Sequence, residues 1–383
     1  MRLADNASNP GDLEPLVKRL LSQKASARGD QPYRSFRVEE VSELLRQFFA
    51  KENLAARVDN VMRVGGGASK EQFSFSLSAT GQSDGRYMLR LDPLAAIVET
   101  DREREFQTIR AMADIVPVPK ALLLDPKGRH FGQPAAIMTF VEGTTKPSAE
   151  GGTSNVTGMG TFIPARFRAL LAPQFITHLA AIHAADWRQG ELARFDVPDA
   201  DPQQAARWQA NWWSYLWQQD RGQPLPMAAL AMVWLRENLP PTSELVLVHA
   251  DYRTGNYLFD EASGEITAIL DWEFAHIGDY HEDLGWVVQR IFGSSDGDRF
   301  YVSGLMERDE FLDAYSAATG RNVDPKALKF YEVLGLMKML AITLATCVKV
   351  ARNGQNHQGI LATWLSTAGH IFTSELCDLL ERD

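Results

Sequence analysis

Two hydrophobic patterns follow one another along this chain, and together they restrict the folds that it can adopt. Between about residues 61 and 143, short apolar runs are separated by glycine, serine and aspartate, and residues 73–77 alternate strictly between apolar and polar. Strict alternation is typical of a strand with one buried face. Residues 1–55 and most of the chain after residue 143 show helical spacing instead. We therefore expect an α+β fold in which a small antiparallel sheet lobe and a larger, mainly helical lobe enclose a ligand cleft.

Length and composition exclude several classes of protein. The chain has 383 residues and a net charge of -10, which argues against a broad nucleic-acid or anionic membrane surface. Its cysteines, Cys347 and Cys377, form no readable zinc or disulfide pattern, and the N-terminus lacks an apolar signal segment. The most apolar stretch, residues 333–348, is interrupted by Lys338 and is expected to be a buried helix. We expect a cytoplasmic protein without nucleic-acid or membrane partners, of unknown oligomeric state.

A predicted hairpin brings two potential metal ligands together. Residues 256–259 and 266–270 are expected to be antiparallel strands, with Gly264 in the turn between them. The start of the first strand then lies beside the end of the second, so Asn256 and Asp271 should meet. Their amide oxygen and carboxylate suit a hard divalent cation such as magnesium, completed by phosphate and water.

Two more polar residues precede the hairpin. Asp251 lies in the loop that enters the same end, five residues before Asn256. A carboxylate there can accept a proton from a hydroxyl or orient it for attack. His249 is placed to hold the backbone of that loop. Each residue alone could merely cap a turn or a helix, but the order His-x-Asp-x4-Asn, hairpin, Asp-Trp-Glu is specific.

The segments at residues 249–256 and 269–273, HADYRTGN and ILDWE, resemble the catalytic and metal-binding segments of aminoglycoside phosphotransferase and choline kinase-like enzymes, relatives of the protein kinases. The resemblance is to the bacterial phosphotransferase branch and runs from about residue 61 to the C-terminal helices. It implies a two-lobed protein kinase-like fold with Asp251 as catalytic base. Asn256 and Asp271 would then be the magnesium ligands.

Neighbouring residues have supporting roles in this interpretation. Ala250 stands where the family usually has glycine, a tolerable change if the backbone angles there are ordinary. Asp283, in the next helix, is expected to brace the catalytic loop. His183 is expected to be a satisfied core histidine rather than a ligand. Glu273 lies close enough to the metal site to contribute, or else caps a helix.

A nucleotide kinase also needs a loop over the phosphates. Gly65, Gly66 and Gly67, with Ser69, allow backbone N–H groups to approach phosphate oxygens. Taken alone, glycines between two strands more often only form a turn. The chain has no Walker A motif. The spaced glycine pattern of the kinase loop is also incomplete, because its third glycine is absent. Glycine pairs followed by small polar residues are, however, common in the resembling branch.

A cation and its support follow in the expected order. Arg90 lies where the family usually places a phosphate-binding lysine, and arginine occurs there in the resembling branch. Glu105 on the following helix matches the supporting glutamate, with Glu103 as a rival partner and a weak surface salt bridge as the alternative. The connection between the lobes is expected to hydrogen-bond adenine through the backbone of Thr139, Phe140 and Val141.

These features predict an enzyme that moves the γ-phosphoryl group of ATP, with magnesium, to a hydroxyl of a small molecule. The expected units are an N-terminal helical extension (1–55), a nucleotide-binding lobe (56–140) and a catalytic and acceptor-binding lobe (141–383). The alternatives are a choline or amino-alcohol kinase-like enzyme, a nucleotide-binding pseudokinase and a protein-modifying kinase. Retention of Asp251, Asn256 and Asp271 speaks against a pseudokinase. No activation segment bounded by Ala-Pro-Glu is evident, which speaks against a protein-modifying kinase.

The acceptor is less constrained. Glu273, Asp279 and Glu282 near the hairpin favour a cationic or polyhydroxyl acceptor, whereas the aromatic residues between Trp208 and Trp217 favour a bulkier, less polar one. Aromatic stripes at helical spacing are usually core, so only one face of that helix is a candidate border of the acceptor pocket.

Overall fold

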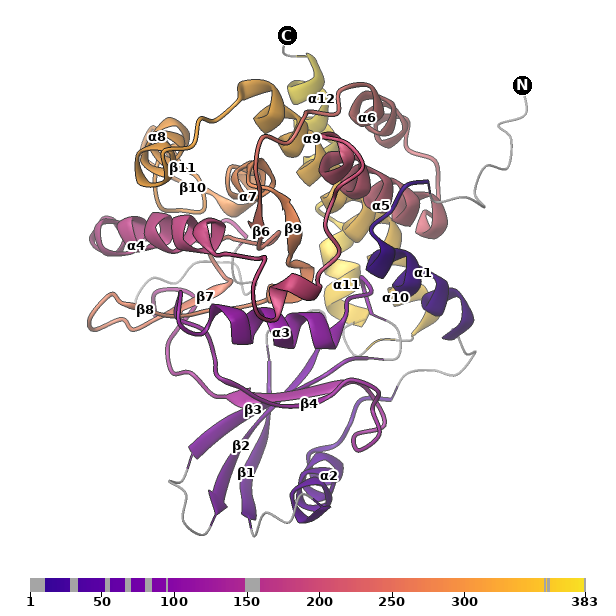
Figure 1. Cartoon of the computed structure of the whole chain (residues 1–383), viewed down its shortest axis with the longest axis vertical. Helices are drawn as coiled ribbons and strands as arrows, with labels where there is room; N and C mark the ends of the chain where they lie inside the picture. The colour runs from indigo at the N-terminus through magenta and orange to yellow at the C-terminus, as the bar shows by residue number, and fades with distance from the viewer. Residues whose placement is uncertain are drawn as a thin grey trace.

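The computed structural model describes residues 11–27, 34–51, 56–65, 70–79, 85–93, 96–148, 159–354, 356 and 359–381. The protein has two lobes (Figure 1), a sheet lobe at the bottom of the view and a larger, mostly helical lobe above it. This is the two-lobed α+β architecture predicted from the sequence pattern.

The small lobe is a five-stranded antiparallel sheet in the order β1-β2-β3-β5-β4. Its strands are β1 (Ala56–Val64), β2 (Glu71–Ala79), β3 (Gly85–Leu91), β4 (Ala121–Asp125) and β5 (Ala135–Thr139). Phe73, Phe75, Leu89 and Leu91 are fully buried in the lobe's own core, as the alternating pattern requires. Helix α2 (Val38–Lys51) packs its apolar stripe into that core.

Helix α3 (Arg102–Met112) lies between the sheet and the helical lobe. Asp101 caps its N-terminus by accepting a hydrogen bond from the backbone N–H of Arg104 at 2.7 Å. Phe106, Ile109 and Met112 pack into the main core of the helical lobe. The helix therefore links the small lobe to the large one.

The helical lobe surrounds a long central helix, α9 (Pro325–Leu340), which continues through the π-helix η4 (Ala341–Cys347) into α10 (Val348–Asn353). The other helices are α4 (Ala165–Ala184), α5 (Gln204–Asp220), α6 (Pro226–Glu237), α7 (His281–Val287), α8 (Arg308–Thr319), α11 (Gly359–Ser366) and α12 (Gly369–Glu381). The continuous stretch Pro325–Asn353 is long and apolar enough for a membrane span, but 78% of its most apolar window is buried inside the protein. It forms a core helix, as predicted.

The helical lobe contains more strands than the sequence pattern indicated. The expected hairpin is present as β7 (Tyr257–Phe259) and β8 (Ile266–Ile269). Further pairs join β6 (Leu245–Val248) to β9 (His276–Asp279) and β10 (Ser294–Asp296) to β11 (Arg299–Tyr301). The sequence pattern indicated only β7 and β8, because β6 and β9 pair across a long intervening segment and β10 and β11 are too short to show alternation.

The two N-terminal helices belong to different lobes. Helix α1 (Pro15–Ala27) buries Val17 and Leu21 in the helical-lobe core, whereas α2 packs on the sheet. In the same segment, Glu14 pairs with Arg104 of α3 at 2.6 Å. The described part of residues 1–55 is thus divided between the lobes rather than forming a separate unit.

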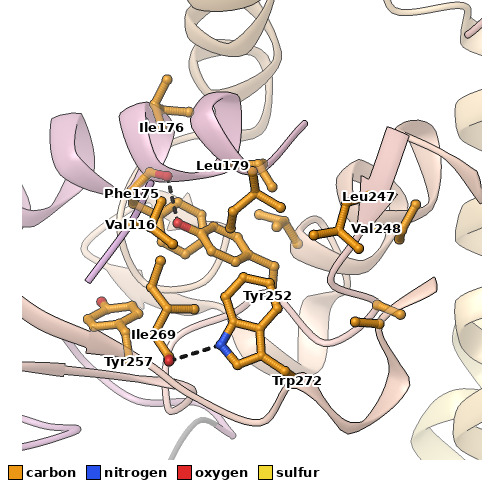
Figure 2. Packing of buried hydrophobic residues seen from close by; sticks show 14 of the residues in the cluster. Val116, Phe175, Ile176, Leu179, Leu247, Val248, Tyr252, Tyr257, Ile269 and Trp272 are labelled. Atoms are coloured by element: carbon orange, nitrogen blue, oxygen red, sulfur yellow. Dashed lines mark hydrogen bonds between the residues drawn. The ribbon is translucent and has the colours of Figure 1, made fainter. Parts of the chain in front are cut away.

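The core beneath the hairpin is aromatic and hydrogen-bonded (Figure 2). Tyr252 donates its hydroxyl proton to the carbonyl of Phe175 at 2.8 Å, and the Trp272 indole donates to the carbonyl of Ile269 at 3.1 Å. Phe175 comes from α4, whereas the other three flank or belong to the hairpin. The first contact anchors the loop before the hairpin to α4, and the second holds Trp272 against the end of β8.

Candidate active site

The hairpin brings Asn256 and Asp271 to the same end of the strand pair. Tyr257 pairs with Ile269, and the Leu270 N–H donates to the Asn256 carbonyl at 2.8 Å. Gly264 occupies the turn with a φ of 72°, a left-handed conformation that glycine adopts without strain. The two residues that the sequence paired as potential metal ligands are therefore neighbours in the structure.

Asp251 points its carboxylate into the same end. Its Oδ1 accepts from the Arg253 Nε at 2.9 Å and from the Trp286 indole at 2.7 Å, and its Oδ2 accepts from the Asn256 amide at 2.6 Å. The side chain is only 15% exposed. Sequence reasoning missed Arg253 and Trp286, the first because it lies in a loop and the second because its partner is 35 residues away.

The backbone of the loop is held from below by Asp283. Its carboxylate accepts the backbone N–H groups of His249 and Ala250, each at 2.8 Å, and a ring N–H of His183 at 3.0 Å. Burial opposes ionisation of this carboxyl, but the hydrogen bonds outweigh burial and hold the pKa of Asp283 below its ordinary value. The contacts of Asp283 and His183 are those expected from the sequence.

His249 is fully buried. Its Nε2 lies 2.9 Å from the Leu270 carbonyl, and its ring packs 4.4 Å from that of Trp272. Its Nδ1 accepts the Asp251 backbone N–H at 3.2 Å. Burial lowers the pKa of His249, which favours the neutral ring that these contacts need. His249 thus holds the loop of residues 249–256 against the hairpin.

Ala250 has a left-handed backbone, with a φ of 62°. The expectation that alanine is tolerable at this position assumed ordinary backbone angles, and that assumption was wrong. A left-handed alanine costs about 1–2 kcal/mol because its Cβ crowds the following carbonyl oxygen. Asp271 is also left-handed, with a φ of 60°, but aspartate adopts this region more readily.

Arg90 joins the small lobe to the hairpin. Its guanidinium pairs with Glu105 of α3 at 2.8 Å and with Asp271 at 2.9 Å, and it is 5% exposed. Glu103, the rival partner, is exposed on α3. Burial opposes ionisation of Glu105, but Arg102 and Arg90 hold the pKa of this carboxyl below its ordinary value.

Lys70 extends this network and was missed from the sequence. Its ammonium is 2% exposed, donates to Thr100 Oγ1 at 2.8 Å, and pairs with Asp92 at 3.1 Å and Glu273 at 3.3 Å. Its position directly before β2, at the end of the glycine-rich loop, was the available signal. Glu273 therefore joins the small lobe rather than capping a helix, and burial raises the pKa of its carboxyl.

Of the predicted phosphate loop, Gly65 directly follows β1, and a Cβ placed on it would meet open space. Gly66, Gly67 and Ser69 lie outside the described residues. Their proposed approach to phosphate oxygens stays a prediction.

The connection between the lobes uses part of its backbone in hydrogen bonds of the sheet lobe itself. The Thr139 N–H donates to the Lys120 carbonyl at 3.0 Å, and the Phe140 N–H donates to the Arg86 carbonyl at 2.9 Å. Both amides are therefore engaged within the sheet lobe. The expected hydrogen bonds of this backbone to adenine stay a prediction, which now rests on the carbonyl groups and the Val141 N–H.

The acidic residues near the hairpin do not line an open groove. Asp279 pairs with His281 at 2.7 Å and Glu282 with His276 at 3.2 Å, and both carboxyls are buried. Glu273 is likewise buried and paired with Lys70. The expectation that these acids favour a cationic acceptor was therefore wrong, because they are buried and paired within the protein.

Helix α5 is core on both aromatic faces. Trp208 and Trp212 are each 7% exposed, and Trp213 and Trp217 are almost fully buried. The idea that one of these faces borders the acceptor pocket is not supported, and the usual core role of such a stripe holds.

Comparison with known proteins agrees with this geometry. The model of the phosphotransferase enzyme family matches residues 60–331. A structure from Ralstonia eutropha, solved under the name of an aminoglycoside phosphotransferase, is similar with a TM-score of 0.63 and 21% identity over 88% of this chain and 97% of that one. An aminoglycoside phosphotransferase solved with AMP-PNP and hygromycin B has a TM-score of 0.55 and 18% identity over 88% and 98%.

A curated relative has a different kind of name. The chain is 27% identical over 320 residues to a protein of Arabidopsis thaliana that carries the name acyl-CoA dehydrogenase IBR3, covering 77% of this chain and 37% of that protein. The chain spans less than half the length of each of the first curated relatives that it matches. With the family model covering most of the chain and a kinase-like fold around Asp251, Asn256 and Asp271, this chain belongs to the phosphotransferase enzyme family.

Proposed function

We propose that the protein transfers the γ-phosphoryl group of ATP, with magnesium, to a hydroxyl of a small molecule. The observation that carries this proposal is the convergence of Asp251, Asn256 and Asp271 at one end of the hairpin, with Arg90 reaching them from the small lobe. A phosphotransferase needs this combination of a carboxylate for the acceptor, oxygen ligands for a metal and a cation for phosphate.

Asp251 is the proposed catalytic base. Three donors, Arg253, Trp286 and Asn256, occupy three of the about four lone-pair sites of this carboxylate, and the acceptor hydroxyl would take the remaining direction. The acceptor oxygen attacks the γ-phosphorus, the bond from phosphorus to the bridging oxygen of ADP breaks, and the hydroxyl proton passes to Asp251. The contacts with Arg253 and Trp286 fix the direction from which this carboxylate meets the acceptor.

Asn256 and Asp271 are the proposed magnesium ligands. The Asn256 nitrogen donates to Asp251, which leaves its amide oxygen for a cation, and the Asp271 side chain is 38% exposed. Among the described residues, no group of three acidic, histidine or cysteine side chains could hold a metal by itself. Two oxygen ligands fit a magnesium ion that arrives with the nucleotide phosphates and neutralises their charge.

For the acceptor we propose a hydroxyl on an acyl chain carried as a coenzyme A thioester. The support is the name shared by the first curated relatives, acyl-CoA dehydrogenases of which this chain matches a minor part. A phosphotransferase segment within such proteins is most useful if both parts act on the same class of substrate. The internal pairing of Asp279 and Glu282 also removes the reason to prefer a cationic amino alcohol or aminoglycoside.

The test is an ADP-release assay across four acceptor classes, with mass spectrometry of the products. The panel contains hydroxyacyl-CoA thioesters with the hydroxyl at successive carbons, the matching free hydroxy acids, choline-like amino alcohols and an aminoglycoside. Asp251→Asn is the blank, and Asp309→Asn, on the exposed face of α8, is the matched control.

We expect a phosphorylated hydroxyacyl-CoA from the wild-type protein and from Asp309→Asn, and none from Asp251→Asn. Phosphorylation of amino alcohols or aminoglycosides alone would overturn the acceptor class but keep the phosphotransferase. Phosphorylation of a protein, with none of any small alcohol, would overturn the small-molecule assignment.

A further inference from the structure

One buried charge near the base has no role in the reaction outlined above. Lys338 lies on α9 with 3% of its surface exposed, and its ammonium donates to the Ala250 carbonyl at 2.6 Å. In the described part of the chain, no carboxylate forms a salt bridge with it. Burying an ammonium without an ion pair costs free energy. The position of Lys338 beside the catalytic loop therefore calls for a physical explanation.

Aromatic rings surround this ammonium. The Nζ of Lys338 lies 4.1 Å from the centre of the Trp286 ring, 4.6 Å from Phe274 and 5.2 Å from Trp213. Cation–π attraction of this kind stabilises a desolvated ammonium and fixes its position. The lysine is therefore held rigidly on a core helix, 88 residues from the loop that it contacts.

The contact falls on the most strained residue of the loop. Ala250 is left-handed, and its two backbone polar groups are taken by opposite charges: Asp283 accepts its N–H at 2.8 Å, and Lys338 donates to its carbonyl. Helices α7 and α9 thus hold the N–H and the carbonyl of the same residue. If Ala250 relaxed to ordinary backbone angles, Asp251 would change direction, and these two hydrogen bonds oppose that relaxation.

A second contact joins the same helices to the base. Trp286, whose ring lies against the Lys338 ammonium, donates its indole N–H to Asp251 Oδ1 at 2.7 Å. Displacement of the ammonium would therefore disturb both the peptide before the base and a hydrogen bond to its carboxylate.

We propose that Lys338 is a positioning residue: its ammonium clamps the Ala250 carbonyl and so holds Asp251 in the orientation that meets the acceptor hydroxyl. The proposal rests on the assignment of Asp251 as base. It places no contact between Lys338 and the nucleotide, whose proposed ligands are Arg90, Asn256 and Asp271.

The experiment compares Lys338→Met with wild type, in steady-state kinetics with the acceptor found in the screen above and in calorimetry with magnesium and ATP. Methionine keeps the length of the side chain but removes the charge and the donor. Lys326→Met, on the exposed start of the same helix, is the matched control. We expect kcat to fall by roughly 10²-fold in Lys338→Met, since misplacement of a catalytic group by about 1 Å has this effect. The Kd for magnesium–ATP should stay within about twofold.

The clamp is tested specifically by adding Ala250→Gly. Glycine adopts a φ near 60° without strain, so the loop no longer needs the ammonium to keep it there. In the Ala250→Gly background we expect Lys338→Met to lower kcat by less than about tenfold, because the two changes act on one backbone conformation. A lysine that only stabilises the core would show the same loss in both backgrounds.

The outcomes separate this proposal from the function on which it rests. A wild-type protein without Asp251-dependent turnover would contradict the proposed function, whatever Lys338 does. Wild-type turnover combined with an unchanged kcat in Lys338→Met, or with an equal loss in the wild-type and Ala250→Gly backgrounds, would overturn the clamp alone. If Lys338→Met does not purify as folded protein, the double variant Ala250→Gly/Lys338→Met is measured instead. A folded and active double variant supports the clamp, and an unfolded or inactive one overturns it.

Discussion

Asp271 combines a left-handed backbone with an ion pair to Arg90 across the lobes. As the proposed metal ligand, it would exchange this arginine for a magnesium ion when the nucleotide binds. The replacement Asp271→Ala should weaken binding of magnesium–ATP by at least about tenfold, because it removes a charged oxygen ligand. Calorimetry with and without magnesium measures the loss. Asp271→Asn, which keeps an oxygen and tolerates the left-handed backbone, should lose less, and equal affinity in all three proteins would contradict the assignment.

Asp283 supports the loop through its charge, which gives its contribution a defined pH dependence. Its pKa is lowered in the folded protein, so the stabilisation is present above the ordinary aspartate pKa of about 3.9 and is lost as the pH falls through the folded value. Asp283→Asn should cost about 3 kcal/mol in the free energy of unfolding at pH 7, as for other buried charged partners.

Urea unfolding of wild type and Asp283→Asn at pH 7 and at successively lower pH tests this assignment. The difference in unfolding free energy between the two proteins should be constant near neutral pH and shrink below about pH 4. A difference that stayed the same down to acid unfolding would show that Asp283 acts through packing alone.

At the scale of elements, β3 and α3 are joined through the Arg90–Glu105 pair. Glu105→Gln removes one of the two carboxylates that hold Arg90, so the arginine would stay on Asp271 and compete with the metal. We expect magnesium–ATP affinity to fall by roughly tenfold, a coupling of about 1.4 kcal/mol. Glu103→Gln, an exposed neighbour on the same helix, should bind as wild type does. Equal binding by all three proteins would exclude the competition.

The sequence predicted those elements whose partners are local or whose geometry is fixed by strand pairing. The hairpin could be predicted because a glycine turn between two apolar runs determines which ends meet, and the alternation at Phe73 and Phe75 identified the buried face of β2. The pairing of β6 with β9 and the contact of Lys338 with Ala250 could not be predicted, since both join residues far apart in sequence. The backbone angle of Ala250 was also hidden, because alanine gives no local signal for a left-handed conformation.

At the scale of the whole molecule, ion pairs connect the two lobes. Arg90 reaches across 181 residues of sequence to Asp271, and Lys70 reaches Glu273 in the same segment. A nucleotide with its metal would bind where these contacts meet, and would stabilise the folded protein by its binding free energy, about 2.7 kcal/mol at a concentration 100 times the Kd.

This linkage predicts a thermal shift. Magnesium and ATP together should raise Tm by roughly 5–10 °C at such a concentration, at about 2–4 °C per kcal/mol for a larger domain. ATP with a chelator, or magnesium alone, should give a much smaller rise. The Asp271→Ala protein should lose most of the difference between these conditions, and a wild-type shift that did not depend on magnesium would contradict the proposed metal site.

The most direct measurement is transfer of labelled phosphate from γ-³²P ATP to the hydroxylated acceptor by the wild-type protein and by Asp251→Asn, with magnesium–ATP affinity measured for both. We expect label on the acceptor hydroxyl with wild type, a rate lowered by roughly 10²- to 10⁴-fold in Asp251→Asn, and nearly equal nucleotide affinity in the two proteins. Equal transfer rates, or a variant that keeps turnover but loses ATP affinity, would contradict the assignment of Asp251 as the base.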